Sequence, residues 1–127
     1  MTSDNLRAFE LQIERFESEL PEQHRQRTQE IALDTLSGIV EGTPIDTGFA
    51  VNNWNVSLDM PDFTTAKVRP APLTRALITM QNLKAFQDVY IANGALYISE
   101  LEDGHSDQAP YGMVDVTLVH IRSKYGL

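Results

Sequence analysis

The 127-residue sequence contains no cysteine, which excludes disulfide bonds, thiolate metal sites and cysteine nucleophiles. It also lacks long apolar runs. No segment approaches the 18 consecutive apolar residues of a membrane-spanning helix, and the first residues, MTSDNLRAFE, have no apolar core of a secretory signal. These absences predict a chain made in the cytoplasm that does not enter a membrane.

Positive charge is scarce as well. Ten Lys and Arg residues stand against eighteen Asp and Glu residues, for a formal net charge of −8. Proteins that grip nucleic acid or anionic membranes cluster Lys and Arg against phosphates, so this balance argues against both partners. Repulsion between acidic chains is screened beyond about 8 Å at physiological salt, so short-range docking between proteins remains open.

Motifs that carry a nucleophile or cradle a phosphate are also missing. The sequence contains no G-x-S-x-G, no Ser-x-x-Lys and no glycine-rich phosphate loop. Carboxylates are numerous, but several fall on the exposed faces of predicted helices and are interpreted as solvating charges: Glu14, Glu17, Glu19, Glu22 and Glu30. We therefore assign no catalytic residue and expect no cofactor.

One stretch, LEDGHSDQAPYG at residues 101–112, raises the question of a metal site. Asp103, His105 and Asp107 alternate like the start of a calcium loop, but the later Gly and bidentate Glu are missing at the right offsets. A zinc site needs further nitrogen or sulfur ligands, and the chain has three histidines. The prediction is a solvated turn in which Asp103-Gly104 makes the reversal, with a metal site as the alternative.

The first forty residues carry two stretches of helical periodicity. Apolar residues recur at spacings of three and four between Leu6 and Leu20, which predicts an N-terminal helix; residues 1–20 are a candidate assembly arm. A second helix is predicted over residues 22–41, with an apolar stripe that faces a core: Ala32, Leu36, Ile39 and Val40. Its first turns, EQHRQRTQE, are polar, so we expect them, His24 included, to project into solvent or onto a partner.

A strand and a loop are predicted next. Trp54, Val56 and Leu58 alternate with polar residues, which is typical of a half-buried strand with the tryptophan in the core. An exposed Trp54 would instead be the best candidate for an interface hot spot. The following PDFTTAKVRPAP, residues 61–72, has three prolines and no periodicity and predicts a long, flexible loop.

The second half of the chain predicts shorter elements. Residues 73–84 have helical spacing, residues 88–92 are rich in strand formers and end at a turn, and residues 95–101 fit a strand or a single helical turn. The tail after Gly112 fits both a strand and a helix, and periodicity alone does not decide between them. His120 lies there among apolar residues and is predicted to be a core or interface side chain.

Two motifs occur together in this chain. The first is TPIDTGFAVNNW at residues 43–54, and the second is IANGALYISELEDGHSDQAPYGMVDVTL at residues 91–118. Their order and separation resemble the neck or tail-completion family of long-tailed double-stranded-DNA bacteriophages, small proteins of the head–tail junction. In the first motif the matching residues are Thr43, Pro44, Asp46, Thr47, Gly48 and Trp54; in the second they are Asn93, Tyr97, Glu100, Leu101, Glu102, Gly104, Ser106, Gln108, Ala109, Pro110, Gly112 and Met113.

The resemblance covers about residues 32–118 and has departures. Ala95 and Leu96 follow Gly94, where a proline is common in the family, and Phe49 stands where a basic residue is common. The proline-bearing segment 61–72 looks like an insert. These departures concern the partner surface more than the fold.

The resemblance implies a single α+β domain over residues 1–127, in which a small sheet packs with N-terminal helices, a middle helix and a C-terminal helix. It decides the ambiguous tail in favour of a helix over residues 111–123. It implies a homo-oligomeric ring, expected to be sixfold, in the virion between the head-closure or connector protein and the tail terminator or tail tube. DNA would pass through the ring without sequence-specific binding.

On that view residues 101–112 are a shaped connection that offers polar groups to neighbouring proteins, and the motif residues are candidate interface residues. We further expect a neutral or negative channel wall without Arg7, Arg15, Arg25 and Arg27, because phosphate-binding cations would slow DNA passage. Isolated subunits are expected to be monomeric or heterogeneous at low concentration. The alternatives are a small metal-dependent hydrolase or nuclease and a cytoplasmic protein-binding module.

Overall fold

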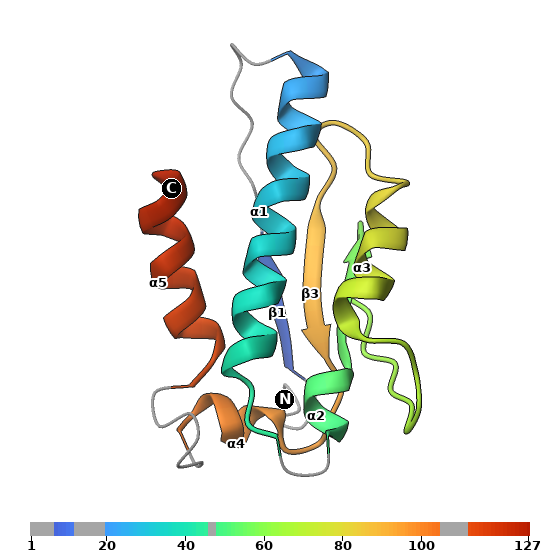
Figure 1. Ribbon diagram of the computed structural model, residues 1–127, viewed down its shortest axis with the longest axis vertical. Coiled ribbons are helices and arrows are strands. Elements are labelled where there is room, and N and C mark those ends of the chain that lie inside the picture. Colours follow the sequence, from blue (N-terminus) through green and yellow to red (C-terminus); the bar gives the residue numbers. More distant parts are fainter. Residues whose placement is uncertain (1–6, 12–19, 46–47, 105–111) are drawn as a thin grey trace.

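The computed structural model describes residues 7–11, 20–45, 48–104 and 112–127. It has the predicted α+β architecture, with helices packed against one small sheet (Figure 1). The elements, in chain order, are β1 (Arg7–Leu11), α1 (Pro21–Gly42), α2 (Phe49–Asn52), β2 (Trp54–Leu58), α3 (Pro72–Met80), β3 (Val89–Asn93), α4 (Ile98–Glu102) and α5 (Val114–Tyr125). In the described part of the chain no helix combines the length and apolarity needed to cross a membrane.

The sheet has the strand order β1-β3-β2, and both neighbouring pairs are antiparallel. The predicted N-terminal helix is wrong over residues 7–11, because β1 pairs residue by residue with β3, from Arg7 opposite Asn93 to Leu11 opposite Val89. The stretch RAFEL also fits a period of two, and pairing satisfies backbone groups along one edge of β3. The rest of that predicted helix lies outside the described residues.

The core lies between α1 and the sheet, with α3 and α5 closing its sides (Figure 1). The predicted second helix is confirmed, and its stripe is buried at Ala32, Leu36 and Ile39, with Val40 half-buried. Trp54 has no exposed surface, which confirms its predicted core position. α3, β3, α4 and α5 contribute further buried apolar side chains: Ala76, Met80, Val89, Ile91, Ile98, Val114 and Ile121.

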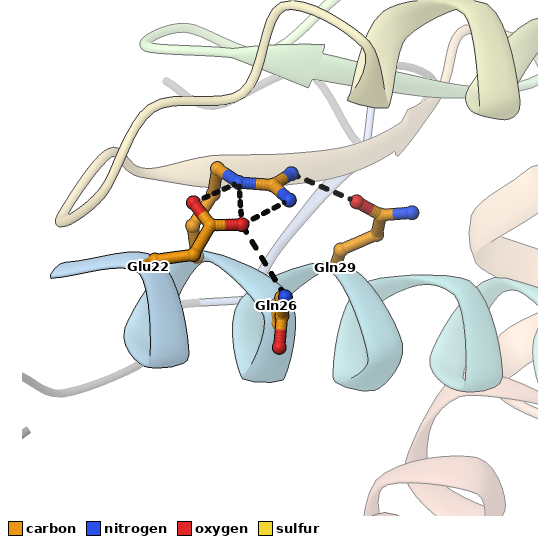
Figure 2. Close-up of polar contacts among 4 residues, drawn as sticks. Glu22, Gln26 and Gln29 are labelled. Carbon is orange, nitrogen blue, oxygen red and sulfur yellow. Dashed lines mark hydrogen bonds and ion pairs between the residues drawn. The ribbon is translucent and has the colours of Figure 1, made fainter. Parts of the chain in front are cut away.

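The first turns of α1 were predicted to project into solvent or onto a partner, and the structure corrects this for two side chains. His24 and Thr28 are buried, because the connection between α3 and β3 folds over this end of the helix. The backbone N–H of Phe86, which has a φ of 62°, donates to Nδ1 of His24 at 3.3 Å, and the two rings lie 4.4 Å apart. On the exposed side of the same turns, Glu22 accepts hydrogen bonds from Arg25 and Gln26 (Figure 2).

The shorter elements agree with the predictions except at their ends. The third helix begins at Pro72 and stops at Met80, four residues earlier than predicted, although the following Leu83 is still buried. β3 is shifted by one residue, and residues 95–101 contribute to a helical turn, α4, rather than a strand. The tail is helical, as the resemblance implied, but His120 is exposed and is not a core side chain.

Candidate functional site

The described parts of the two motifs meet at one end of the molecule, where α1 and β3 finish and α2, α4 and α5 begin (Figure 1). We call this the motif end. The first motif supplies the connection from α1 to α2 and the first residue of β2. The second supplies the last three residues of β3, then α4 and the start of α5.

Two residues of the first motif form a buried polar relay. The Thr43 hydroxyl donates to the carbonyl of Ile39 at 2.6 Å, and the indole N–H of Trp54 donates to the Thr43 oxygen at 2.9 Å. Both side chains are buried, so each polar atom needs a partner within the protein. The relay fixes the end of α1 to the start of β2.

Asn93 links the second motif to the first. It lies opposite Trp54 in the sheet and is fully buried. Its Nδ2 donates to the carbonyl of Ala50 in α2 at 2.8 Å, and its Oδ1 accepts from the backbone N–H of Ala95 at 2.9 Å. One amide side chain therefore holds α2 and the exit from β3 in place.

Glu102 caps α5 from another helix. Its carboxylate accepts the backbone N–H groups of Met113, Val114 and Asp115, at 2.9, 2.8 and 2.9 Å. The first N–H groups of a helix lack partners within it, and an anion is favoured at this end of the helix dipole. Met113, at the N-cap position, supplies no side-chain cap, so the buried carboxylate takes that role.

Gly112 permits this cap. Its φ is +82°, and a Cβ at this position would lie 2.3 Å from the carbonyl oxygen of Glu102 and 3.0 Å from its carboxylate carbon. Gly48 and Gly104 also have positive φ, which agrees with their predicted turns. The glycines of the motifs therefore serve backbone conformation and close approach.

Some of the remaining motif positions are described by the structure and others are not. Pro44 is buried, and Tyr97 is 38% exposed beside α4. Six lie outside the described residues: Asp46, Thr47, Ser106, Gln108, Ala109 and Pro110. Asp103 is exposed, while His105 and Asp107 also lie outside, so the metal alternative stays a prediction. Among the described residues, no group of three His, Cys, Asp or Glu side chains is placed to hold a metal ion.

The sequence interpretation missed a polar cluster that ties down the 61–71 loop. Asn53 accepts from the backbone N–H of Ala66 at 2.9 Å, and Asn55 donates to the carbonyls of Asp62 and Thr64 at 2.8 and 2.9 Å. The loop predicted to be flexible is thus bonded to β2 and its preceding turn. The sequence signal that could have indicated this cluster is NNWN, residues 52–55, in which the buried Asn53 and Asn55 stand on either side of the tryptophan.

Arg75 completes this cluster from α3. Its guanidinium donates to Asn55 Oδ1 at 2.7 Å and to the carbonyls of Asn52 and Trp54 at 2.6 and 3.0 Å. Burial, and then the nearby charge of Arg69, lower the pKa of Arg75 from its usual value. This arginine is committed to internal bonds and belongs to the scaffold.

A second feature that the sequence did not indicate is the junction between α1 and α5. Lys124 forms an ion pair with Asp34 at 2.7 Å, and the Tyr125 hydroxyl donates to the same carboxylate. These hydrogen bonds lower the pKa of Asp34. The pKa of Tyr125 is raised, first by burial and second by the hydrogen bond to Asp34. A hollow of about 190 Å³ opens beside them, lined by Asp34, Ser37, Gly38, Glu41, His120, Ile121 and Lys124.

No family model, curated protein or solved structure matches this chain.

Proposed function

We propose that this chain is a structural subunit of a phage neck, and that copies of it form a ring joining the DNA-filled head to the tail. The observation that carries the proposal is the pair of motifs at residues 43–54 and 91–118, in the order and at the separation seen in neck or tail-completion proteins. Their described residues also lie together at the motif end, joined through Asn93 and Trp54.

The chemistry at the motif end supports a scaffold role. The polar atoms of Thr43, Asn93 and Glu102 are directed at backbone groups of neighbouring segments. Bonds of this kind fix loop conformation, and they leave the side chains engaged instead of free to attack a substrate. A subunit that must present the same surface to successive partners needs such fixed connections.

The ring itself follows from repeated contact. If each copy makes the same heterologous contact with the next and the rotation closes, a ring results. The ring would contact the head-closure or connector protein on one side and the tail terminator or tail tube on the other, with a channel for DNA. Surplus acid suits such a channel, because few cations are available to bind phosphates as DNA passes.

A nonsense mutation in the phage gene for this chain tests the proposal. We expect infected cells to accumulate DNA-filled heads and complete tails that remain separate in electron micrographs. Purified protein added to the lysate should restore joined, infectious particles, whereas buffer alone should not. Joined particles formed without the chain, or a defect in replication before any head is filled, would rule out the proposed role.

A further inference from the structure

The two edges of the sheet are held differently. At the β2 edge, α3 packs along the strand, and the Arg75 guanidinium donates to the carbonyl of Trp54 at 3.0 Å. Asn55, also in β2, donates to the carbonyls of Asp62 and Thr64. β1 forms the other edge, and among the described elements β3 is the one that its backbone lies along. β2 is thus fixed from several directions, whereas β1 is joined to the fold mainly through β3.

β3 needs a strand at this edge. Val89, Ile91 and Asn93 are buried, and buried backbone N–H and C=O groups require hydrogen-bond partners. β1 supplies these partners along the whole of β3, from Arg7 opposite Asn93 to Leu11 opposite Val89. An uncovered strand edge is a template on which another strand pairs. This edge of β3 is therefore an acceptor for the sequence RAFEL, whichever copy of the chain supplies it.

The connection after β1 has the length needed to reach a neighbouring copy. Residues 12–20 join β1 to α1, and a chain of this length spans up to about 30 Å when extended. A domain of 127 residues has a radius of gyration of about 14 Å. The two lengths are of the same order, so β1 can be placed on a copy that touches its own. Exchange of an identical element costs little, because the strand makes the same pairs in either copy.

We infer that in the ring β1 of each copy leaves its own sheet and pairs with β3 of the next copy, in the register that it has within one chain. The donated strand and the accepting edge are different surfaces, so the contact is heterologous and its repetition can close a ring. The inference rests on the ring proposed above and names the segment that makes its repeating contact.

Concentration decides between the closed arrangement, with β1 on its own β3, and the exchanged one. A linker of this length keeps β1 near its own β3 at an effective concentration on the order of 1 mM. Free copies at micromolar concentration therefore stay closed, in agreement with the monomers expected at low concentration. Copies that head and tail proteins hold side by side meet at a comparable local concentration, so exchange takes place at the site of assembly.

A disulfide tests the exchange, because the chain has no cysteine of its own. Ala8 and Ala92 are opposite each other in the β1–β3 pair, and antiparallel partners lie at Cα distances that a disulfide bridges. A chain with Ala8→Cys and Ala92→Cys is oxidised in complete phage particles. We expect a ladder of linked copies on a non-reducing gel, with the 8–92 link identified by mass spectrometry. Internal links alone, or no link between these positions, would overturn the inference.

Two single-cysteine variants test the exchange without the phage. Copies with Ala8→Cys and copies with Ala92→Cys have no internal partner, so a link between them requires β1 to change copies. Oxidation of the mixture at about 1 mM should give 8–92 heterodimers, because this concentration matches that of the closed arrangement. Dimers linked 8–8 in place of 8–92 would indicate edge-to-edge contact of two β1 strands and would overturn the inference, as would the absence of heterodimers.

The matched control pairs Ala8→Cys with Ala71→Cys. Ala71 is exposed directly before α3, so it meets other molecules more readily than the buried Ala92 does. This mixture should remain unlinked under the same conditions. Linking as strong as that of the 8–92 mixture would mean random collision and would count against the exchange. Circular dichroism should give the wild-type signal for every variant.

Locking β1 in its own copy connects the exchange to assembly. The variant with both Ala8→Cys and Ala92→Cys, oxidised at low micromolar concentration, should carry an internal link that prevents β1 from leaving. It should fail to join heads to tails in the mutant lysate, and reduction with dithiothreitol should restore joining to the level of wild-type protein treated in the same way. A locked chain that joins as well as the reduced one would overturn the inference.

The two assays keep the two proposals distinct. If wild-type protein joins heads to tails and the locked chain does so too, the function stands and the exchange is wrong. If joining does not need the chain but the mixed single-cysteine variants form 8–92 heterodimers, the exchange stands and the function is wrong.

Discussion

Single side chains at the motif end act mainly on the backbone. Glu102 replaces an N-cap residue that α5 lacks, Gly112 leaves room for it, and Asn93 holds α2 to the end of β3. The sequence identified all three positions through the motif, but not their roles. Each role depends on a partner that is distant in sequence, and spacing along the chain does not reveal such a partner.

Replacing Glu102 tests the cap. Glu102→Ala leaves three N–H groups of α5 without their acceptor, so we expect a loss of about 2–3 kcal/mol in the free energy of unfolding. Glu102→Gln keeps one acceptor oxygen and should lose less. Chemical denaturation measures both. Glu100→Ala, an exposed change on the same helix, should stay within about 0.5 kcal/mol of wild type. Equal stability of the Glu100 and Glu102 variants would refute the cap.

Two glycines with similar φ separate strain from steric clash. Gly112→Ala must adopt a φ of +82° and also place a Cβ 2.3 Å from a carbonyl oxygen, whereas Gly126→Ala at +70° meets nothing within 4 Å. We expect Gly126→Ala to cost about 1 kcal/mol and Gly112→Ala clearly more, because something must shift to admit the methyl group. Thermal unfolding of the two variants gives the comparison. A similar loss in both would mean that contact with Glu102 does not restrict this position.

At the scale of elements, α1 and β2 could be predicted because their periodicity is local. Both lie within a few residues of their predicted ranges, and so does α5, although periodicity left strand and helix open there and the resemblance implied the helix. β1 could not be predicted, because RAFEL fits both the period of a helix and the period of a strand. Only its pairing with β3, far along the chain, decides between them. The burial of His24 was missed for a similar reason, since a segment some sixty residues away covers it.

The contact between α1 and α5 depends on a small residue. A Cβ on Gly38 would lie 2.7 Å from the Thr117 methyl group. Alanine favours a helix over glycine by about 1 kcal/mol, but overpacking of this kind costs about 1–3 kcal/mol, so Gly38→Ala should be neutral to destabilising. Thr117→Ala in the same chain should relieve the clash. A double-mutant cycle should therefore give a favourable coupling of about 1 kcal/mol, and additive effects would contradict the close packing.

The Asp34 cluster should make the α1–α5 junction sensitive to acid. Hydrogen bonds from Lys124 and Tyr125 lower the pKa of Asp34 in the folded protein, so its contribution to stability is present above the ordinary aspartate value of about 4 and is lost as the pH falls through the lowered pKa. Wild type should exceed Asp34→Asn in stability by up to about 1 kcal/mol near neutral pH and lose this margin in strong acid.

Urea unfolding of both chains across the acid range measures this margin. Lys124→Met removes the largest cause of the lowered pKa and should weaken the same pH dependence. A margin that stays constant down to strong acid would show that the Asp34 carboxylate does not stabilise the junction.

The whole molecule combines a motif end held by internal hydrogen bonds with a net charge of −8. Composition indicates an acidic chain, in which residues 63–87 contain four basic side chains and no acidic one. The net charge agrees with weak association of isolated copies, because like charges repel one another.

An electron-microscopy reconstruction of the neck of the phage that encodes this chain tests the account most directly. We predict a closed ring of copies between head and tail, with a channel wall that is not lined by Arg25 and Arg27. A neck built without this chain, or with the chain elsewhere in the particle, would contradict the account.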